Sequence, residues 1–394
     1  MYRATLCCGR RYYVHGVTLY TRYILRLIWG GVGWGGVELL TDGIDMFLLC
    51  IESAEMTNEK LITGCGDVTV HTDTMEQIPN AEMVSEGNRE NIKSKLKILS
   101  LFSGCGGLDY GFETSDEFCV VKAYDFNKDA VENYNLNFAG NKAEHFDINQ
   151  INTSTFENID LIIGGPPCQD FSVAGKKQLG ERSSMTTKFI EIICDIKPKY
   201  FIMENVPTIK SVGRDVYLSI VSKLKETGYG LTENIVNMSD YGVPSLRKRI
   251  VIMGALNECD DVFQEYFVSH KDKCTSLAEY LTKNNISLDT QLNDIYRHPC
   301  NYSRRGVFSF DELYPTIRGC MRRMPPKYKF HEGDTCKVRD QVLNPTIDIL
   351  SKIQTFPDSF KFIEKRNNQL LIGNSVPPLM SVKLRNILLS YINR

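Results

Sequence analysis

The chain has 394 residues, and its 46 basic and 48 acidic side chains leave a formal net charge of −2. That balance excludes a uniformly basic nucleic-acid-binding chain, so any binding to DNA must rest on a local patch of positive charge. Thirteen cysteines, an odd number without a Cys-x-x-Cys pair, argue against a disulfide framework and for a reducing compartment, which we expect to be the cytoplasm.

Residues 1–95 differ in character from the rest of the chain. The apolar run around residues 30–36 is interrupted by charged side chains and is too rich in glycine for a membrane-spanning helix, so no membrane association is expected. Residues 42–95 contain eleven acidic and four basic side chains with little periodicity, which predicts weak structure. We treat residues 1–95 as a weakly structured N-terminal extension, and we hypothesise that translation starts at Met56, so that residues 1–55 are not translated.

The first strand-to-helix turn of the remaining chain is rich in glycine. Residues 97–102 form an apolar run that is typical of a buried parallel strand, and residues 103–113 follow with three glycines before a helix. Glycine permits a tight turn and lets the backbone approach a nucleotide-like ligand closely. Glycine turns also serve packing, so the loop alone is weak evidence.

An acidic residue ends the second strand of this series. Residues 119–124 predict a strand, and Asp125 follows directly. A carboxylate at this position of a doubly wound sheet is placed to bind ribose hydroxyls. Phe126 comes next and is placed to lie against an adenine face.

A cysteine lies on a stiff turn after the third apolar strand, residues 159–163. The turn reads Gly-Gly-Pro-Pro-Cys-Gln-Asp-Phe-Ser over residues 164–172. Its glycines allow a sharp bend and its prolines fix the backbone, so that Cys168 is displayed. An arbitrary cysteine after a core strand is more often a buried structural residue. The flanking residues here favour a nucleophile, because thiolate is the strongest nucleophile among common side chains.

Strands and helices continue to alternate toward the C-terminus. Strands are predicted at residues 199–203, 231–238 and 249–255, with a helix at 215–227 and a final helix at 376–392. This alternation predicts an α/β fold with a doubly wound, Rossmann-like sheet. The predicted sheet domain covers residues 96–255 and is completed by residues 365–394, while residues 256–364 form a smaller domain.

The motifs between residues 96 and 394, taken in order, resemble those of the cytosine-5 DNA methyltransferases of prokaryotic or viral restriction-modification systems. The resemblance rests on the glycine loop, on Pro166-Pro167-Cys168-Gln169, on Glu204-Asn205-Val206, on the arginines at 247 and 249, and on residues 372–378 (Ile-Gly-Asn-Ser-Val-Pro-Pro). It implies an S-adenosylmethionine-dependent methyltransferase sheet with a smaller target-recognition domain. The positions that match the cofactor contacts of the family are Phe102, Gly104, Gly106, Gly107, Leu108, Asp125, Phe126, Asp147, Ile148, Pro167, Asn374 and Val376.

The chemistry of such an enzyme explains the catalytic positions that the resemblance implies. Carbon 5 of cytosine is too electron-poor to attack a sulfonium methyl group, so a nucleophile, Cys168, must first add at carbon 6. The charge that builds up on the ring needs a proton donor and a fixed cation, and Glu204 and Arg249 match these roles, with Arg247 as the second arginine of the pair. Alternatively, Glu204 is a helix cap and both arginines are solvated surface charges. Ser245 stands where the family usually has glutamine, which predicts the loss of a scaffold contact.

A basic segment follows, in the place where the family has its target-recognition region. Residues 297–339 contain ten arginines or lysines against four acidic side chains, interleaved with aromatic residues. Such a segment suits a DNA cleft, although a solvated basic face is the alternative. The histidines and cysteines of this region fit no usual zinc spacing, so no metal is expected. The predicted DNA contacts, including two in the catalytic loop, are Gln169, Ser172, Arg304, Arg305, Thr316, Arg318, Arg322 and Arg323.

Three functions are consistent with the sequence. The first is a DNA cytosine-5 methyltransferase that acts as a monomer on a flipped-out cytosine in double-stranded DNA and is paired with a restriction endonuclease. The second is cytosine-5 methylation of transfer RNA, although the Cys-Phe-Thr tripeptide typical of that branch is absent. The third is a non-catalytic DNA-binding homologue, which the intact Cys168, Glu204 and Arg249 argue against.

Overall fold

The computed structural model describes most of the chain from residue 95 onward, and only the strands of the segment before it. The described residues are 3–14, 17–30, 33–41, 95–167, 181–288, 290–299, 301, 303–320, 322–364 and 367–394. The chain divides into two units, residues 1–89 and residues 90–394.

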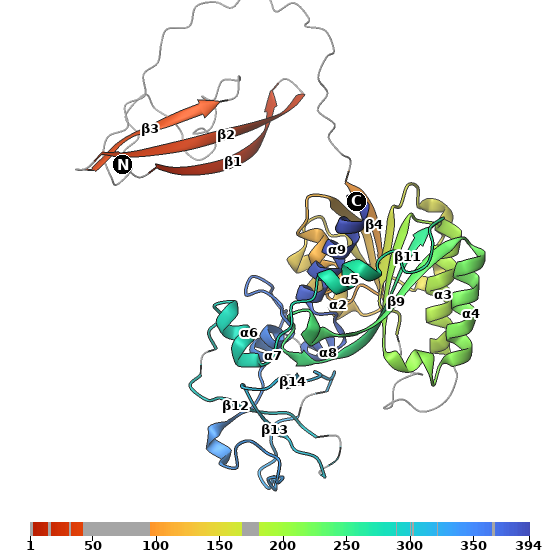
Figure 1. The fold of residues 1–394 in the computed structure, drawn as a ribbon, viewed down its shortest axis with the longest axis vertical. Coiled ribbons are helices and arrows are strands. Elements are labelled where there is room, and N and C mark those ends of the chain that lie inside the picture. The colour runs from red at the N-terminus through yellow and green to blue at the C-terminus, as the bar shows by residue number, and fades with distance from the viewer. Residues whose placement is uncertain are drawn as a thin grey trace, which may run out of the picture. The chain divides into compact units, whose positions relative to one another are not determined.

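The first unit contains a three-stranded antiparallel sheet. Its strands are β1 (Arg3–Val14), β2 (Val17–Gly30) and β3 (Gly33–Thr41), and they follow one another in chain order (Figure 1). Runs of threonine, tyrosine, isoleucine and leucine suit extended backbone, yet the sequence analysis did not predict these strands. The weak structure expected for residues 42–95 falls almost entirely outside the described residues, and a start at Met56 stays a prediction.

The second unit is built around a seven-stranded sheet, in which β6, β5, β4, β7 and β8 pair in parallel and β11 is antiparallel to both of its neighbours, β8 and β9. The spatial order is β6-β5-β4-β7-β8-β11-β9. The doubly wound, Rossmann-like α/β fold is therefore confirmed. The strands are β4 (Leu96–Leu101), β5 (Phe118–Asp125), β6 (Ala143–His145), β7 (Leu161–Gly164), β8 (Tyr200–Asn205), β9 (Tyr229–Asn237) and β11 (Lys248–Leu256).

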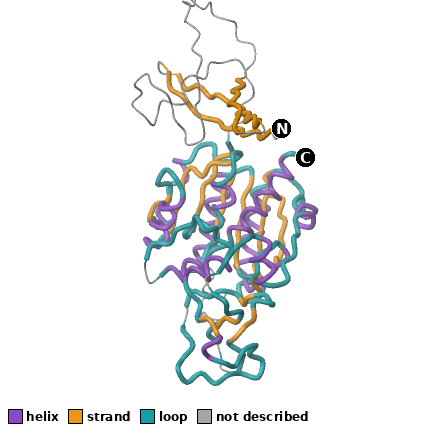
Figure 2. Tube along the Cα trace, turned by 90° about the vertical axis from the view of Figure 1, so that its left-hand side faces the viewer, coloured by secondary structure: helices purple, strands orange, loops and turns teal. Residues whose placement is uncertain are grey.

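Helices cover both faces of this sheet, as the two views show (Figures 1 and 2). On one face lie α1 (Tyr110–Glu113), α2 (Lys128–Asn137) and α9 (Pro378–Ile392), and on the other lie α3 (Glu181–Ile196) and α4 (Arg214–Glu226). Because the central strands are buried on both faces, they read as continuous apolar runs in the sequence. No helix among the described residues combines the length and the apolar character that crossing a lipid bilayer requires.

The residues predicted to form a smaller domain have little regular structure. A three-stranded sheet has the order β13-β12-β15, and β14 pairs in parallel with β10. Directly after the predicted boundary at residue 256, α5 packs on α9, with the rings of Tyr266 and Tyr391 6.2 Å apart; the boundary itself stays a prediction. The elements are β10 (Ser245–Leu246), α5 (Gln264–Ser269), α6 (Leu277–Lys283), β12 (Asp294–Tyr296), β13 (Val307–Ser309), β14 (Tyr314–Pro315), β15 (Val342–Leu343), α7 (Ile347–Ile353) and α8 (Asn368–Asn374).

Five short 3₁₀ helices connect these elements in the described part of the chain. They are η1 (Ile148–Gln150), η2 (Thr153–Thr155), η3 (Pro207–Lys210), η4 (Met238–Asp240) and η5 (Arg339–Gln341).

Candidate active site

The predicted site residues gather where the parallel strands end. The glycine loop follows β4, Asp125 ends β5, Gly165 follows β7, and Glu204 is the next-to-last residue of β8. The carboxyl ends of parallel strands meet at one edge of a sheet, and ligands of open α/β sheets bind outside this edge. The strand order places the loop and Asp125 on neighbouring strands, with Glu204 two strands further along.

Backbone amides hold the Asp125 carboxylate. Its Oδ2 accepts a hydrogen bond from the Gly104 amide at 2.8 Å, and its Oδ1 accepts one from the Asn127 amide at 2.8 Å. Burial raises the pKa of Asp125, while these two hydrogen bonds act in the opposite direction. The carboxylate is thereby fixed against the glycine loop by groups that no side-chain substitution removes.

The glycines of the loop serve two different purposes. Gly104 has a φ of +56°, and a Cβ built on it meets nothing within 4 Å. A Cβ on Gly107, in contrast, would lie 1.9 Å from Ser375 Oγ and 2.3 Å from the Val376 carbonyl oxygen. Gly107 is therefore needed for close packing against the last motif of the chain, whereas Gly104 leaves open space in front of the loop.

The residues around this open space fit S-adenosylmethionine. The Phe126 side chain is 71% exposed beside Asp125, and its ring centre lies 5.5 Å from that of His145. Asp147 Oδ1 accepts the Asn149 amide at 3.0 Å, and Ile148 is buried. An exposed aromatic ring, a fixed carboxylate and an open glycine backbone are the groups that a nucleoside with a ribose needs.

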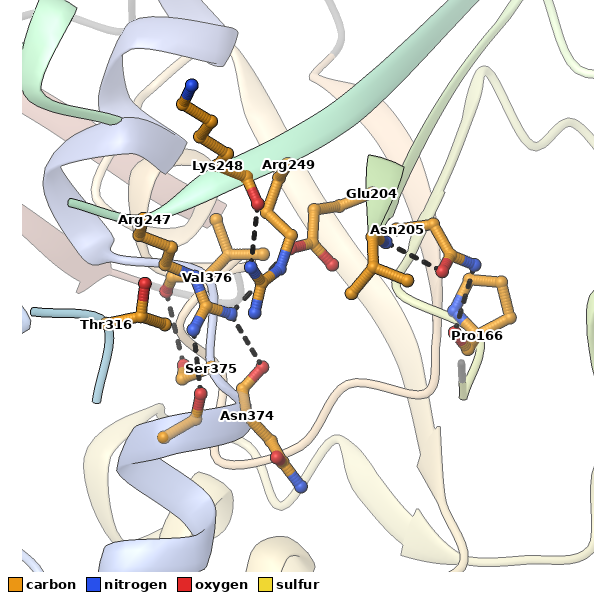
Figure 3. Close-up of polar contacts among 12 residues, drawn as sticks. Pro166, Glu204, Asn205, Arg247, Lys248, Arg249, Thr316, Asn374, Ser375 and Val376 are labelled. Atoms are coloured by element: carbon orange, nitrogen blue, oxygen red, sulfur yellow. Dashed lines mark hydrogen bonds and ion pairs between the residues drawn. The ribbon is translucent and has the colours of Figure 1, made fainter. Parts of the chain in front are cut away.

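Glu204 lies beside the two arginines (Figure 3) and close to Gly165, which precedes Cys168 in the chain. Its side chain is buried, Arg249 Nε lies 2.8 Å from its Oε1, and a Cβ built on Gly165 would lie 3.3 Å from its Oε2. The following 3₁₀ helix begins at Pro207 with no side-chain cap. The alternative interpretation of Glu204 as a helix cap is therefore wrong, because its carboxylate is directed to the arginines.

Arg247 is one of the most deeply buried side chains of the described residues, with 1% exposure. Its Nη1 donates to the Gly373 carbonyl oxygen at 2.8 Å and its Nη2 to that of Asn374 at 3.4 Å, while Nη2 lies 3.7 Å from Glu204 Oε1 (Figure 3). Arg247 is therefore not a solvated surface charge. It joins the Glu204 carboxylate to the loop that the sequence analysis assigned to the cofactor.

The loop before Cys168 is attached to the same strand. Asn205 Nδ2 donates to the Pro166 carbonyl oxygen at 3.4 Å, and Asn205 Oδ1 accepts the Val206 amide at 2.8 Å. In the sequence, Asn205 was quoted only as part of the Glu204-Asn205-Val206 motif. Its position next to Glu204 is the sequence signal for its contact with the Pro166 carbonyl group. Cys168, Gln169 and Ser172 lie outside the described residues.

Several predicted DNA contacts are engaged within the protein. Both terminal nitrogens of Arg305 contact Glu312, at 3.0 and 2.5 Å, and its guanidinium lies 4.3 Å from the centre of the Phe308 ring. Arg318 donates to the His298 carbonyl oxygen, and Thr316 Oγ1 donates to that of Leu246 at 2.8 Å. These contacts could not be read from charge and spacing alone.

Six of the other basic side chains of this segment lie at the surface, whereas Arg297 and Arg339 are half-buried and donate to backbone carbonyl groups. Asp334, one of its four acidic residues, is buried and accepts amide hydrogen bonds from Gly306, Val307 and His331 at 2.7 to 2.9 Å. Since Glu312 is paired with Arg305, little negative charge opposes the surface cations. The exposed basic residues of the segment are Arg304, Arg322, Arg323, Lys327, Lys329 and Lys337.

Comparisons with known proteins show the family of the chain. The family model described as C-5 cytosine-specific DNA methylase matches residues 96–389. The chain is 40% identical over 292 residues to the Type II methyltransferase M.HindV of Haemophilus influenzae, covering 72% of this chain and 92% of that protein. It is 36% identical over 310 residues to the Type II methyltransferase M.HgiDI of Herpetosiphon aurantiacus, covering 76% and 96%. The crystal structure of the S. pombe Dnmt2 methyltransferase matches in fold, with a TM-score of 0.52, 20% identity, and coverage of 76% of this chain and 100% of that one.

The family match and the two relatives identify the chain as a methyltransferase. The chain belongs to the C-5 cytosine-specific DNA methylase family, and its activity is DNA cytosine-5 methylation.

Proposed function

We propose that this enzyme transfers a methyl group from S-adenosylmethionine to carbon 5 of a flipped-out cytosine in a specific double-stranded sequence. We further propose that it acts as a monomer and protects that sequence from a partner restriction endonuclease. The names of the two relatives, both Type II methyltransferases, support this pairing. The observation that carries the proposed mechanism is the Glu204 carboxylate, held by Arg249 against the start of the Cys168 loop.

S-adenosylmethionine, when bound, supplies an electrophilic methyl group on a sulfonium. Asp125 would hold the ribose through the carboxylate that the Gly104 and Asn127 amides fix, and Phe126 would cover the adenine. The open backbone face of Gly104 leaves room for the ligand. Ser375 and Val376 border the same loop through the close packing of Gly107, and Asn374 directly precedes them in the chain.

The chain's own residues would activate the cytosine ring. The Cys168 thiolate forms a bond to carbon 6, and Glu204 gives a proton to ring nitrogen 3, so that carbon 5 becomes nucleophilic. Arg249 provides the fixed positive charge beside the ring. After carbon 5 is methylated, its proton leaves to a base and the carbon–sulfur bond breaks. Ring nitrogen 3 returns its proton to the Glu204 carboxylate, and the Cys168 thiolate is regenerated.

A duplex that contains 5-fluorocytosine at the target position tests this mechanism, because fluorine cannot leave as a cation. We expect a stable adduct with wild-type enzyme in the presence of S-adenosylmethionine, visible as a shifted band on a denaturing gel. Peptide mapping should place it on Cys168 and on no other of the thirteen cysteines. Cys168→Ser should abolish both turnover and trapping, since a serine hydroxyl is a far weaker nucleophile.

The buried Cys105 serves as the internal control for this experiment. Burial raises its pKa to about 12, so it should stay an unreactive thiol. An adduct at Cys105, or a fully active Cys168→Ser variant, would overturn the mechanism. Bisulfite sequencing of DNA from cells that express the enzyme would then identify the methylated sequence.

A further inference from the structure

A closed circuit of contacts joins residues 314–319, here called the recognition segment, to the Glu204 pocket. The segment begins with β14, which pairs in parallel with β10, and Tyr314 donates its amide to the Pro244 carbonyl oxygen at 3.0 Å. Thr316 Oγ1 then donates to the Leu246 carbonyl oxygen at 2.8 Å. Leu246 directly precedes Arg247, so the segment is attached to the backbone that carries the paired arginines (Figure 3).

The other end of the recognition segment lies against α8. Gln369 Nε2 donates to the Arg318 carbonyl oxygen at 3.0 Å. The two backbones approach so closely that a Cβ on Gly373 would lie 2.7 Å from the Arg318 carbonyl carbon, and a Cβ on Gly319 2.4 Å from Leu370 Cδ1. Any movement of the segment must therefore move α8 with it or break these contacts.

Arg247 closes the circuit. It donates to the carbonyl oxygens of Gly373 and Asn374 at the end of α8, and its Nη2 lies 3.7 Å from Glu204 Oε1. Thr316 thus contacts the backbone next to Arg247. Gln369 belongs to α8, the helix whose carbonyl groups accept the hydrogen bonds of Arg247. Both ends of the recognition segment are therefore connected to the buried Arg247 side chain. Arg247 in turn contacts the Glu204 carboxylate, which we assign to cytosine.

Thr316 and Gln369 each have an internal partner in this circuit, whereas Arg322 and Arg323 just beyond the segment are exposed. DNA bound at those arginines would restrain the recognition segment at its C-terminal end. Thr316 was predicted to contact DNA directly. In the structure its hydroxyl group donates to the Leu246 carbonyl oxygen instead.

We propose that Thr316 and Gln369 are positioning residues that couple DNA recognition to the setting of Glu204. This proposal rests on the proposed function, in which the exposed arginines of the small domain hold DNA. When cognate DNA fixes the recognition segment, the hydrogen bonds of Thr316 and Gln369 fix Arg247, and Arg247 fixes the carboxylate. A site that leaves the segment free is bound but methylated slowly.

Thr316→Val, which keeps the shape and removes the donor, tests the coupling, with Thr316→Ser as the variant that retains the hydroxyl. Loss of one neutral hydrogen bond should lower kcat about five- to tenfold. The KM for DNA and the Kd for S-adenosylmethionine should stay within about twofold of wild type, and Thr316→Ser should restore kcat. An unchanged kcat in Thr316→Val, or a raised KM at unchanged kcat, would overturn the proposal, the latter by making Thr316 a DNA contact.

Gln369→Met provides an independent second variant, because Gln369 lies on a different element. It should lower kcat in the same way, and the Thr316→Val/Gln369→Met double variant should lose less than the product of the two single effects, since both act through Arg247. Full multiplicativity, or a kcat loss that follows the melting temperature in every variant, would contradict the coupling. Arg322→Ala separates the two hypotheses: it should weaken DNA binding and lower the salt slope by about one. If it does so while Thr316→Val is normal, the coupling fails and the proposed function stands.

Discussion

The two halves of the active-site edge hold their carboxylates in different ways. On the cofactor side, Asp125 is fixed by two backbone amides at 2.8 Å, from Gly104 and Asn127. On the cytosine side, Glu204 is held by the side chains of Arg249 and Arg247, with the nearest contact at 2.8 Å. One carboxylate therefore depends on the course of the main chain, and the other on two long side chains.

This difference matches the role that we propose for each half. A ribose is bound and released without chemical change, so a rigid acceptor is sufficient. A group that exchanges a proton with a ring needs nearby charged partners that interact electrostatically with it. Arginine suits this role because it stays protonated throughout. Side-chain partners also allow the cytosine half to be connected to distant segments, as Arg247 connects it to Gly373 and Asn374.

The largest effect should come from Glu204→Gln, which keeps the shape of the side chain and removes its acidic proton. We expect single-turnover methylation to fall by about 10²- to 10⁴-fold, the usual contribution of a general acid. The Kd for S-adenosylmethionine should stay within about twofold, because Asp125 is held by backbone amides and not by this carboxylate.

Glu233→Gln is the matched control for this variant, since Glu233 pairs with Lys210 at 2.5 Å on the edge strand β9, outside the site. It should methylate at the wild-type rate. Equal losses in the two variants would mean that Glu204 acts only through folding, and an active Glu204→Gln enzyme would remove it from the chemistry.

A smaller effect is expected from Asp125→Ala, and it should fall on cofactor binding and not on the methylation step. One charge-assisted hydrogen bond is worth about 1.5 to 3 kcal/mol, so calorimetry should show S-adenosylmethionine binding weakened about tenfold or more while duplex affinity is retained. Because burial raises the pKa of Asp125, wild-type affinity should also fall as the pH is lowered, and at a higher pH than for an ordinary aspartate. This pH dependence should disappear in the variant.

Asp116→Ala is a suitable control for Asp125→Ala, because the Asp116 side chain is fully exposed and its ion pair with Lys95, at 3.6 Å, lies at the surface. If the two alanine variants bound the cofactor equally well, the ribose would have to be held elsewhere. Asp125 could then no longer represent the cofactor half in the comparison with Glu204.

The sequence predicted the sheet and its edge well because both depend on local patterns. The apolar runs at 97–102 and 199–203 lie within one or two residues of β4 and β8, since strands buried on both faces must be apolar throughout. The prediction that Arg247 is catalytic rested on resemblance, and its contacts with Gly373 and Asn374 join residues far apart in the chain. The pairing of Arg305 with Glu312 was hidden for a similar reason, because charge counts do not show which ions meet.

Asp109 offers a last way to sharpen the comparison, since it is a second carboxylate on the cofactor side with a side-chain partner. It is fully buried directly before α1, Tyr134 donates its hydroxyl to Oδ1 at 3.1 Å, and burial raises the pKa of Asp109 to about 7. An unfolded aspartate titrates near 3.9. The folded state therefore holds the proton more tightly, and the stability that this contributes is complete below about pH 4 and lost as the pH rises to about 7.

Asp109→Asn removes this titration and keeps an oxygen that can accept the hydrogen bond of Tyr134. The melting temperature of the variant relative to wild type should therefore be higher at about pH 8 than at about pH 5, as measured by scanning calorimetry of the cofactor-free enzyme. Asp116→Asn, at an exposed position, should show the same offset at both values. A constant offset for Asp109→Asn as well would mean that Asp109 is ionised across this range. The buried carboxylate would then need a stabilising partner beyond Tyr134, and the cofactor half would resemble the cytosine half more closely than the contacts of Asp125 suggest.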